Sequence, residues 1–240
     1  MLGTFDIIRI INMVVYFLIT ASLFYLASKR FNHVQLGNAL IAYWIFDTVY
    51  NAFLTISGPV PVDALPYQLC TLTMIMSAIA IRQKNEKLYQ ITIYTWISAL
   101  VSMLTPTKNG LMPFFDYHTV VFYVSHGIIP LMQIYMTRVF RFKLYKYSFF
   151  NVLVFLLLYS FSAWSINLFA GTNFAFISHP EQENVILSSL GSGFLYSLKL
   201  IFIAILVMIF DELILKFLFR IKVHQFNVFI FRFFGNNGKQ

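Results

Sequence analysis

Residues 147–169 read YSFFNVLVFLLLYSFSAWSINLF, a stretch of 23 residues without a charged side chain. A helix needs about 20 mostly apolar residues to cross a hydrocarbon core roughly 30 Å thick, because each residue rises 1.5 Å. Runs of similar length recur along the chain. Their approximate limits are 7–28, 36–57, 64–81, 88–105, 115–137, 147–169 and 191–219. The sequence therefore predicts an all-α membrane protein, a bundle of seven transmembrane helices.

The composition excludes a soluble globular protein. Of the 240 residues, 59% are hydrophobic and only 11% are charged, whereas soluble domains carry about 25% charged residues. We expect a transmembrane domain over 1–219 and a basic, aromatic cytoplasmic tail over 220–240. The tail suits a helix lying in the plane of the lipid headgroups, with a disordered tail as the alternative. The first span has no small-residue cleavage site and is longer than a signal-peptide core, so we expect it to be retained.

The distribution of Lys and Arg gives the orientation. Positive side chains near the ends of spans stay on the cytoplasmic side during insertion. Fourteen of the 17 follow spans 1, 3, 5 and 7, whereas Arg9 and Lys108 lie on the other side and Lys199 lies inside a span. The N-terminus is thus predicted outside and the C-terminus in the cytoplasm. The net charge of +8 then faces anionic lipid headgroups and not a nucleic acid, because the chain has no basic folded domain.

Polar side chains within the spans are the candidate functional residues, because burying an ionisable group in a bilayer costs several kcal/mol unless it is paired or hydrated. They occur in spans 2, 3, 5 and 7: Asp47, Asn51, Cys70, His118, His126 and Lys199. From the helical rise, Cys70 lies roughly 9 Å below the outer end of its span, Asp47 roughly 15 Å, and His126 between about 13 and 18 Å. We expect one outward-opening pocket to hold these residues together.

Most of these residues also have a structural interpretation. Asp47 and Lys199 can neutralise each other across the bundle. Asn51 suits a hydrogen bond between helices. His118 lies near the interface, where an amphipathic ring is stable. Cys70, the single cysteine, can be a small buried hydrophobe.

His126 is the residue for which a functional role is favoured. It lies deep in its span, between Ser125 and Gly127 and four residues before Pro130. A proline inside a helix frees the carbonyl four residues earlier and kinks the helix there. Such an opening gives a ligand or water access to His126.

Four short motifs follow one another from the third span onward: Leu65-Pro66-Tyr67-Gln68-Leu69-Cys70, Leu104-Thr105-Pro106, Ser125-His126-Gly127 and Gly171-Thr172-Asn173-Phe174. In this order, over roughly residues 40–215, the chain resembles the YwaF-like family of bacterial integral membrane proteins. That family is similar to an animal transmembrane acyltransferase that places acyl chains on ether phospholipids. More remotely, it resembles androgen-induced-gene-type membrane hydrolases that use a threonine and a histidine.

The resemblance implies a Cys–His pair that acts on an acyl ester, with Cys70 as nucleophile and His126 as general base. An imidazole can activate a thiol in this way, although the two groups must meet at about 3 Å. Gln68 and Val121 stand where many family members have histidines. Candidate substrate-binding residues, including groups that would steady an oxyanion, are Asp47, Asn51, Gln68, His118, Asn173 and Lys199.

The sequence thus favours an intramembrane acyl transferase or lipid hydrolase that acts on phospholipid acyl chains. We expect membrane lipids as partners, no metal and no cofactor, and a multi-pass location in a cell membrane, from the resemblance a bacterial plasma membrane. One alternative is a module that binds or transports a small ligand or protons through Asp47, Lys199 and His126. Another is a noncatalytic membrane subunit whose tail docks a partner.

Overall fold

The computed structural model describes residues 4–58, 65–104, 117–180, 185–217 and 223–224. Helices make up most of this part of the chain, which confirms the all-α prediction. The elements in order are α1 (Thr4–Arg30), α2 (His33–Ser57), α3 (Leu69–Gln83), α4 (Glu86–Thr95), α5 (Ile97–Leu104), α6 (Tyr117–Arg138), β1 (Leu144–Tyr145), α7 (Ser148–Ala170), the 3-10 helix η3 (Phe174–Phe176), α8 (Val185–Ser189), α9 (Gly193–Phe217) and β2 (Val223–His224).

Four of the described helices are long and apolar enough to cross a membrane. They are Ile10–Arg30 within α1, and α2, α6 and α7 in full. Helix α3 is apolar but shorter. The chain is therefore a multi-pass helical membrane protein, as predicted, while the number of seven spans and their orientation remain predictions.

The predicted third span, 64–81, is wrong at its beginning. Residues 65–68 form a turn in which the Tyr67 amide donates to the Leu65 carbonyl over 2.7 Å. Gln68 is the N-cap, with extended backbone angles, and α3 begins at the next residue. Pro66 therefore precedes the helix and does not occupy its first turn.

The predicted fourth span, 88–105, is two helices in the structure. Helix α4 ends at Thr95 and α5 begins at Ile97. At the break, the Ala99 amide donates to the Trp96 carbonyl, only three residues back. The tighter bond interrupts the regular helix at Trp96.

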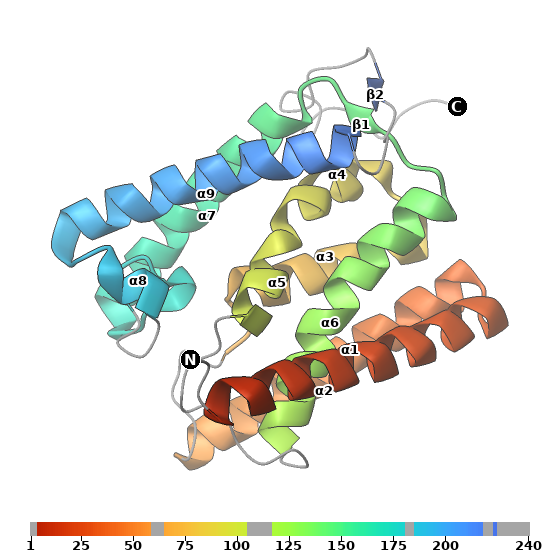
Figure 1. Ribbon diagram of the computed structural model, residues 1–240, viewed down its shortest axis with the longest axis horizontal. Coiled ribbons are helices and arrows are strands. Elements are labelled where there is room, and N and C mark those ends of the chain that lie inside the picture. The colour runs from red at the N-terminus through yellow and green to blue at the C-terminus, as the bar shows by residue number, and fades with distance from the viewer. Residues whose placement is uncertain (1–3, 59–64, 105–116, 181–184, 218–222, 225–240) are drawn as a thin grey trace.

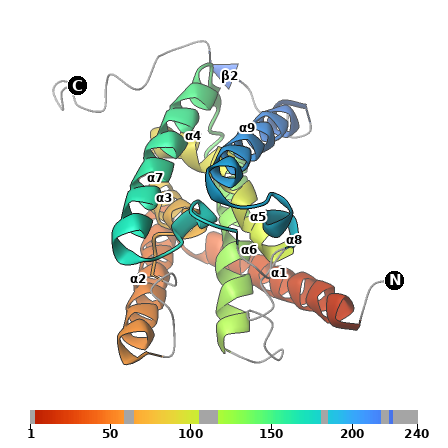
Figure 2. The same ribbon diagram turned by 90° about the vertical axis from the view of Figure 1, so that its left-hand side faces the viewer.

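Helix α3 lies at the centre of the bundle and packs against α2, α4 and α6 (Figures 1 and 2). Helix α1 packs on α6, α7 packs on α4, and α9 contacts α4 and α7. In Figure 1 the line of α6 runs obliquely to that of α3. This crossing determines which residues of the two helices meet.

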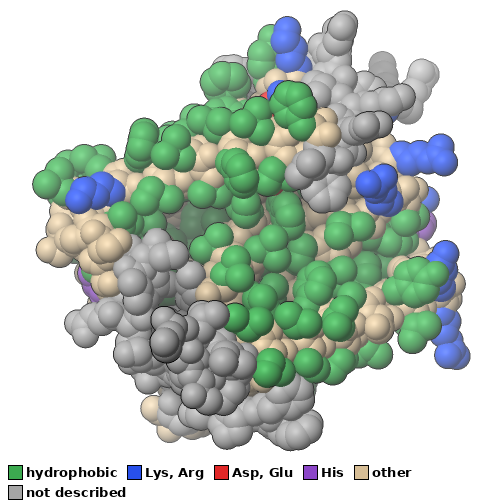
Figure 3. All heavy atoms as spheres, in the orientation of Figure 1, with side chains coloured by type: hydrophobic (Ala, Val, Ile, Leu, Met, Phe, Trp, Pro, Cys, Tyr) green, Lys and Arg blue, Asp and Glu red, His purple; other side chains and the backbone are tan. Residues whose placement is uncertain are grey.

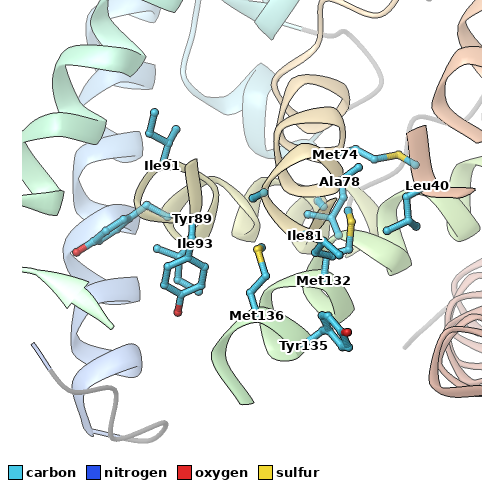
Figure 4. Close-up of a cluster of buried hydrophobic side chains, with 14 of the residues drawn as sticks. Leu40, Met74, Ala78, Ile81, Tyr89, Ile91, Ile93, Met132, Tyr135 and Met136 are labelled. Carbon is cyan, nitrogen blue, oxygen red and sulfur yellow. The ribbon is translucent and has the colours of Figure 1, made fainter. Parts of the chain in front are cut away.

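The core is built where α3, α4 and α6 meet (Figure 4). Ala78, Ile81, Met132 and Met136 are all fully buried there. Helices α2 and α3 approach each other closely at Gly37, where an added Cβ atom would lie 2.5 Å from the Cβ atom of Arg82. Only a glycine permits this approach without a shift of backbone.

Buried hydroxyls and amides join the central helices. Thr73 of α3 donates to Thr95 of α4 over 2.8 Å. Gln133 of α6 donates to Ser77 of α3 over 2.8 Å and accepts from Thr92 of α4 over 3.2 Å. Such bonds hold helices together where a bilayer supplies no hydrophobic driving force.

The outer surface is apolar (Figure 3). Phe169 and Ile56 are 88% and 87% exposed, and hydrophobic side chains cover much of the visible face. Lys and Arg gather at the right-hand edge of that view. A wide apolar band with charges at one end suits a protein surrounded by lipid.

Most of the predicted tail, 220–240, lies outside the described residues. Within it, Val223 and His224 form β2, which pairs in parallel with β1. The structure therefore ties the start of this segment to the connection between α6 and α7.

Candidate functional site

Cys70 lies in the first turn of α3 and is half-buried. Its side chain faces α5, where the Sγ atom is 3.4 Å from Ser98 Oγ and 3.7 Å from Ser102 Oγ. Both serines also donate to backbone carbonyls: Ser98 to that of Thr95 at the end of α4, and Ser102 to that of Ser98 in α5. A hydroxyl has one proton, so in this arrangement the two serines face the thiol as acceptors.

The imidazole of His126 is held by its own helix. Its Nδ1 atom lies 2.7 Å from the Phe122 carbonyl oxygen, and the Phe122 ring packs against it with centroids 4.3 Å apart. A carbonyl oxygen can only accept, so Nδ1 carries the ring proton. In the neutral ring, Nε2 is then the nitrogen with a free lone pair.

Cys70 and His126 lie close enough for their side chains to interact electrostatically, although the depths estimated from the sequence separate them by several Å. The hydrogen bonds that the thiol makes within the described residues go to Ser98 and Ser102. Those depths treat the helices as parallel to one axis, whereas α6 runs obliquely to α3 (Figure 1). The crossing brings the middle of α6 to the first turn of α3.

Asp47 of α2 lies within electrostatic range of His126. Its nearest partner is Asn51, whose Nδ2 atom donates to Asp47 Oδ1 over 3.1 Å and to the Asp47 carbonyl over 2.9 Å. Asn51 therefore bonds within its own helix and not between helices as its structural interpretation supposed. His126 and His118 both lie within electrostatic range of the Asp47 carboxyl. His118 is exposed in the first turn of α6.

Other polar groups surround Asp47. Tyr43 OH lies 2.7 Å from Ser125 Oγ and so joins α2 to α6 beside His126. Three further buried atoms, Trp44 Nε1, Thr48 Oγ1 and Tyr117 OH, have no hydrogen-bond partner within the described part of the chain. Buried polar atoms rarely remain unpaired in the functional state of a protein. They are candidates for contact with a polar ligand.

Gln68 and Asn173 have structural contacts at the end of the bundle near Cys70. Gln68 Oε1 accepts from the Ala175 amide over 3.0 Å. Asn173 donates to the His179 carbonyl over 2.8 Å and accepts from the amides of Ser178 and His179. The loop after α7 thereby closes over the start of α3.

Lys199 does not belong to this cluster. It is exposed on α9 and donates to the Leu190 carbonyl over 2.9 Å. The ion pair between Asp47 and Lys199 that the sequence left open is not formed between these two described residues. Both α2 and α9 were correctly predicted as helices, but sequence depth does not say which helices are neighbours.

Several residues of interest were not found from the sequence. Ser98 and Ser102 carry no signal, because serines are common in membrane helices. Asp211 does carry one: it is an acid within the predicted span 191–219. It is fully buried, and its two carboxylate oxygens lie 3.2 and 3.3 Å from Trp96 Nε1.

The described residues contain no group of three or more His, Cys, Asp or Glu side chains that could hold a metal ion.

These features define a multi-pass helical membrane protein with a thiol, an imidazole and a carboxyl gathered between α2, α3, α5 and α6. Residues 1–210 match the model of the TMEM164 family, and the chain belongs to this family. The match confirms the resemblance at the level of a membrane-protein family; the YwaF-like name and the link to acyl transfer are not part of it. No curated protein and no solved structure matches the sequence.

Proposed function

We propose that this protein transfers or hydrolyses acyl chains of membrane phospholipids, with Cys70 as nucleophile and His126 as general base. The observation that carries the proposal is the proximity of the Cys70 thiol, within electrostatic range, to an imidazole whose Nδ1 atom is held by the Phe122 carbonyl. A held imidazole next to a thiol is the usual arrangement of an activated cysteine. The bacterial plasma membrane, taken from the resemblance, is part of the same proposal.

In the first half of the reaction, His126 Nε2 accepts the thiol proton and the Cys70 sulfur attacks the carbonyl carbon of a phospholipid ester. The tetrahedral intermediate collapses by breaking the bond to the glycerol oxygen. That oxygen takes the proton from His126 and leaves as a lysophospholipid hydroxyl. The acyl group remains on Cys70 as a thioester.

In the second half, a hydroxyl of another lipid, or water, gives its proton to His126 Nε2 and attacks the thioester. The carbon–sulfur bond breaks, and the thiolate recovers the proton from His126. With a lipid hydroxyl the result is acyl transfer, and with water it is hydrolysis. Rotation of the Ser98 or Ser102 hydroxyl would turn each from an acceptor into a donor to the thiolate.

The experiment that tests the proposal measures the alkylation rate of the thiol in the protein reconstituted in lipid. Because the chain has one cysteine, iodoacetamide labelling reports on Cys70 alone. We expect labelling faster than that of a free thiol, and slower by about tenfold or more in His126→Ala, because the base that forms the thiolate is gone.

His33→Ala is the matched control. His33 is the first residue of α2 and packs against Phe140, just beyond the far end of α6, so its removal should leave the labelling rate unchanged. A lipid-derived acyl thioester on the wild-type protein, absent from Cys70→Ala, would be detected by mass spectrometry of the intact chain. Equal labelling rates in wild type and His126→Ala would reject the mechanism.

The alternative of a transport module has less support. It requires Asp47, Lys199 and His126 to act on one ligand, whereas Lys199 is exposed on α9 and bonds to the carbonyl of Leu190, which lies between α8 and α9. A noncatalytic subunit that docks a partner through its tail concerns residues that lie mostly outside the described part.

A further inference from the structure

A groove opens between α4, α6 and α9. Its cavity volume is about 40 Å³, and it is partly open to the surroundings. Ile93 and Trp96 form one wall, Pro130 and Ile134 of α6 a second, and Leu215 of α9 a third. The lining is almost wholly apolar.

The groove continues the side of α6 that carries His126. Pro130, Gln133 and Thr137 line it, and they follow His126 at intervals of four, seven and eleven residues, which share one helix face. At 1.5 Å per residue, the lining from Pro130 to Arg138 lies about 6 to 18 Å beyond His126. Cys70 and His126 are not among its lining residues, and His126 lies about one helical turn before Pro130, the first residue of α6 in the lining.

Polar groups lie at the opposite end of α6. His118 precedes His126 by about 12 Å along the helix and lies within electrostatic range of Asp47. Along α6 the order is therefore a polar region, then the Cys70–His126 pair, then an apolar groove. A phospholipid has the same order: a polar headgroup, an ester and a hydrocarbon chain.

We propose that this groove holds the acyl chain of the phospholipid substrate while its ester lies at Cys70 and its headgroup lies toward Asp47 and His118. This proposal rests on the proposed function, and it adds a site for the chain and a basis for chain selectivity.

The groove selects by shape. Lipid tails are as apolar as its walls, so entering it brings no gain from the hydrophobic effect. Selection among acyl chains therefore depends on lining side chains that are held in fixed positions. Trp96 is held in this way, because its indole N–H donates a hydrogen bond to the buried Asp211 carboxyl group.

Occupancy can be tested without catalysis by fluorescence. The chain has three tryptophans, so Trp44→Phe with Trp164→Phe leaves Trp96 as the only one. Nanodiscs of phosphatidylcholine would contain an increasing fraction of a phosphatidylcholine brominated in mid-chain, which quenches nearby indoles. A variant that keeps only Trp164, which is 47% exposed on α7, reports on the bulk bilayer.

We expect quenching of Trp96 to saturate at a low content of brominated lipid, and Ile134→Phe to abolish the saturable part by adding bulk to the groove. Val139→Phe is the matched control: Val139 directly follows the last residue of α6 and is 58% exposed, but it is not part of the lining. Quenching that rises only in proportion to brominated lipid, as for Trp164, would show ordinary bilayer lipid in the groove and overturn the proposal.

Chain selectivity provides the second measurement. In Ile134→Phe, transfer of long acyl chains should fall about tenfold relative to short ones, because overpacking opposes the longer chain. Val139→Phe should keep the wild-type ratio, and an unchanged ratio in Ile134→Phe would contradict the proposal.

The two proposals can fail separately. Saturable quenching with an unreactive Cys70 would keep the groove as a lipid site and reject the reaction. A reactive Cys70 with proportional quenching would keep the reaction and reject the groove.

Discussion

Two serine hydroxyls beside the Cys70 sulfur give the candidate site a feature beyond a thiol and a base. Ser98 and Ser102 lie 3.4 and 3.7 Å from the sulfur, one turn apart on α5. A hydroxyl that donates to a thiolate stabilises it, because hydrogen bonds to charged groups are worth about 1.5–3 kcal/mol. The serines would therefore favour the reactive form of Cys70.

Ser98→Ala should slow the alkylation of Cys70 by about tenfold at neutral pH, since the thiolate loses one donor. The measurement is the iodoacetamide rate, followed across a range of pH to separate thiolate fraction from access. Ser165→Ala is the control, because Ser165 bonds only to the Phe161 carbonyl of its own helix on the exposed side of α7. An unchanged or faster rate in Ser98→Ala would show that the hydroxyl holds the neutral thiol instead.

The sequence predicted individual polar residues better than their partners. An ionisable group in a hydrophobic run is visible without a structure, and Cys70, His126 and Asp47 were found in this way. The partner depends on which helix face lies opposite, and the sequence does not contain that directly. For this reason Lys199 was grouped with Asp47, although the structure places its side chain against the Leu190 carbonyl.

At the scale of elements, α2, which carries Asp47, packs on α3, which carries Cys70. The two helices lie close together at Gly37, where Arg82 leaves no room for a Cβ atom. A shift of α2 at this point would be carried along the helix toward Asp47.

Gly37→Ala should lower the thermal stability of the purified protein. The new methyl group would lie 2.7 Å from the Arg82 Cα atom, and overpacking of this kind costs about 1–3 kcal/mol. The higher helix propensity of alanine offsets at most about 1 kcal/mol of this loss in the free energy of unfolding. Thermal unfolding in detergent measures the difference.

Gly127→Ala is the control for this change. There the nearest side-chain atom, in the Phe17 ring, lies 3.5 Å from the added Cβ atom, an ordinary contact. Its melting temperature should equal or exceed that of the wild type. A Gly37→Ala protein as stable as Gly127→Ala would show that α2 and α3 separate at little cost.

Helix limits could be predicted from the sequence to within a few residues for most spans. The ends of a long apolar run such as 147–169 lie close to the ends of the helix, and α7 runs from Ser148 to Ala170. The start of α3 could not be predicted, because it depends on the bond between Gln68 and the distant Ala175. The break at Trp96 depends in the same way on tertiary contacts.

At the scale of the whole molecule, the gathering of Lys and Arg at one end (Figure 3) matches the charge bias on which the orientation was predicted. That orientation would place the first turn of α6 toward the outside and the groove in the inner half of the bilayer. The loop after α7 would then be extracellular.

Cysteine accessibility tests the orientation. In a Cys70→Ala background, His179→Cys should react with a membrane-impermeant maleimide in intact cells, whereas Lys87→Cys should react only after permeabilisation. Both residues are exposed, at opposite ends of the predicted bundle. The cysteine-free background must remain unlabelled, and the reverse pattern of labelling would invert the topology.

The bond from the Ala175 amide to Gln68 joins residues 107 positions apart, and this separation has a consequence during synthesis. A ribosome that has released only the first six helices has delivered both Cys70 and His126 to the membrane. Ala175, whose amide bonds to the N-cap residue of α3, has not yet been made. We therefore expect the first turn of α3, which carries the proposed nucleophile, to reach its final order only once translation has passed α7.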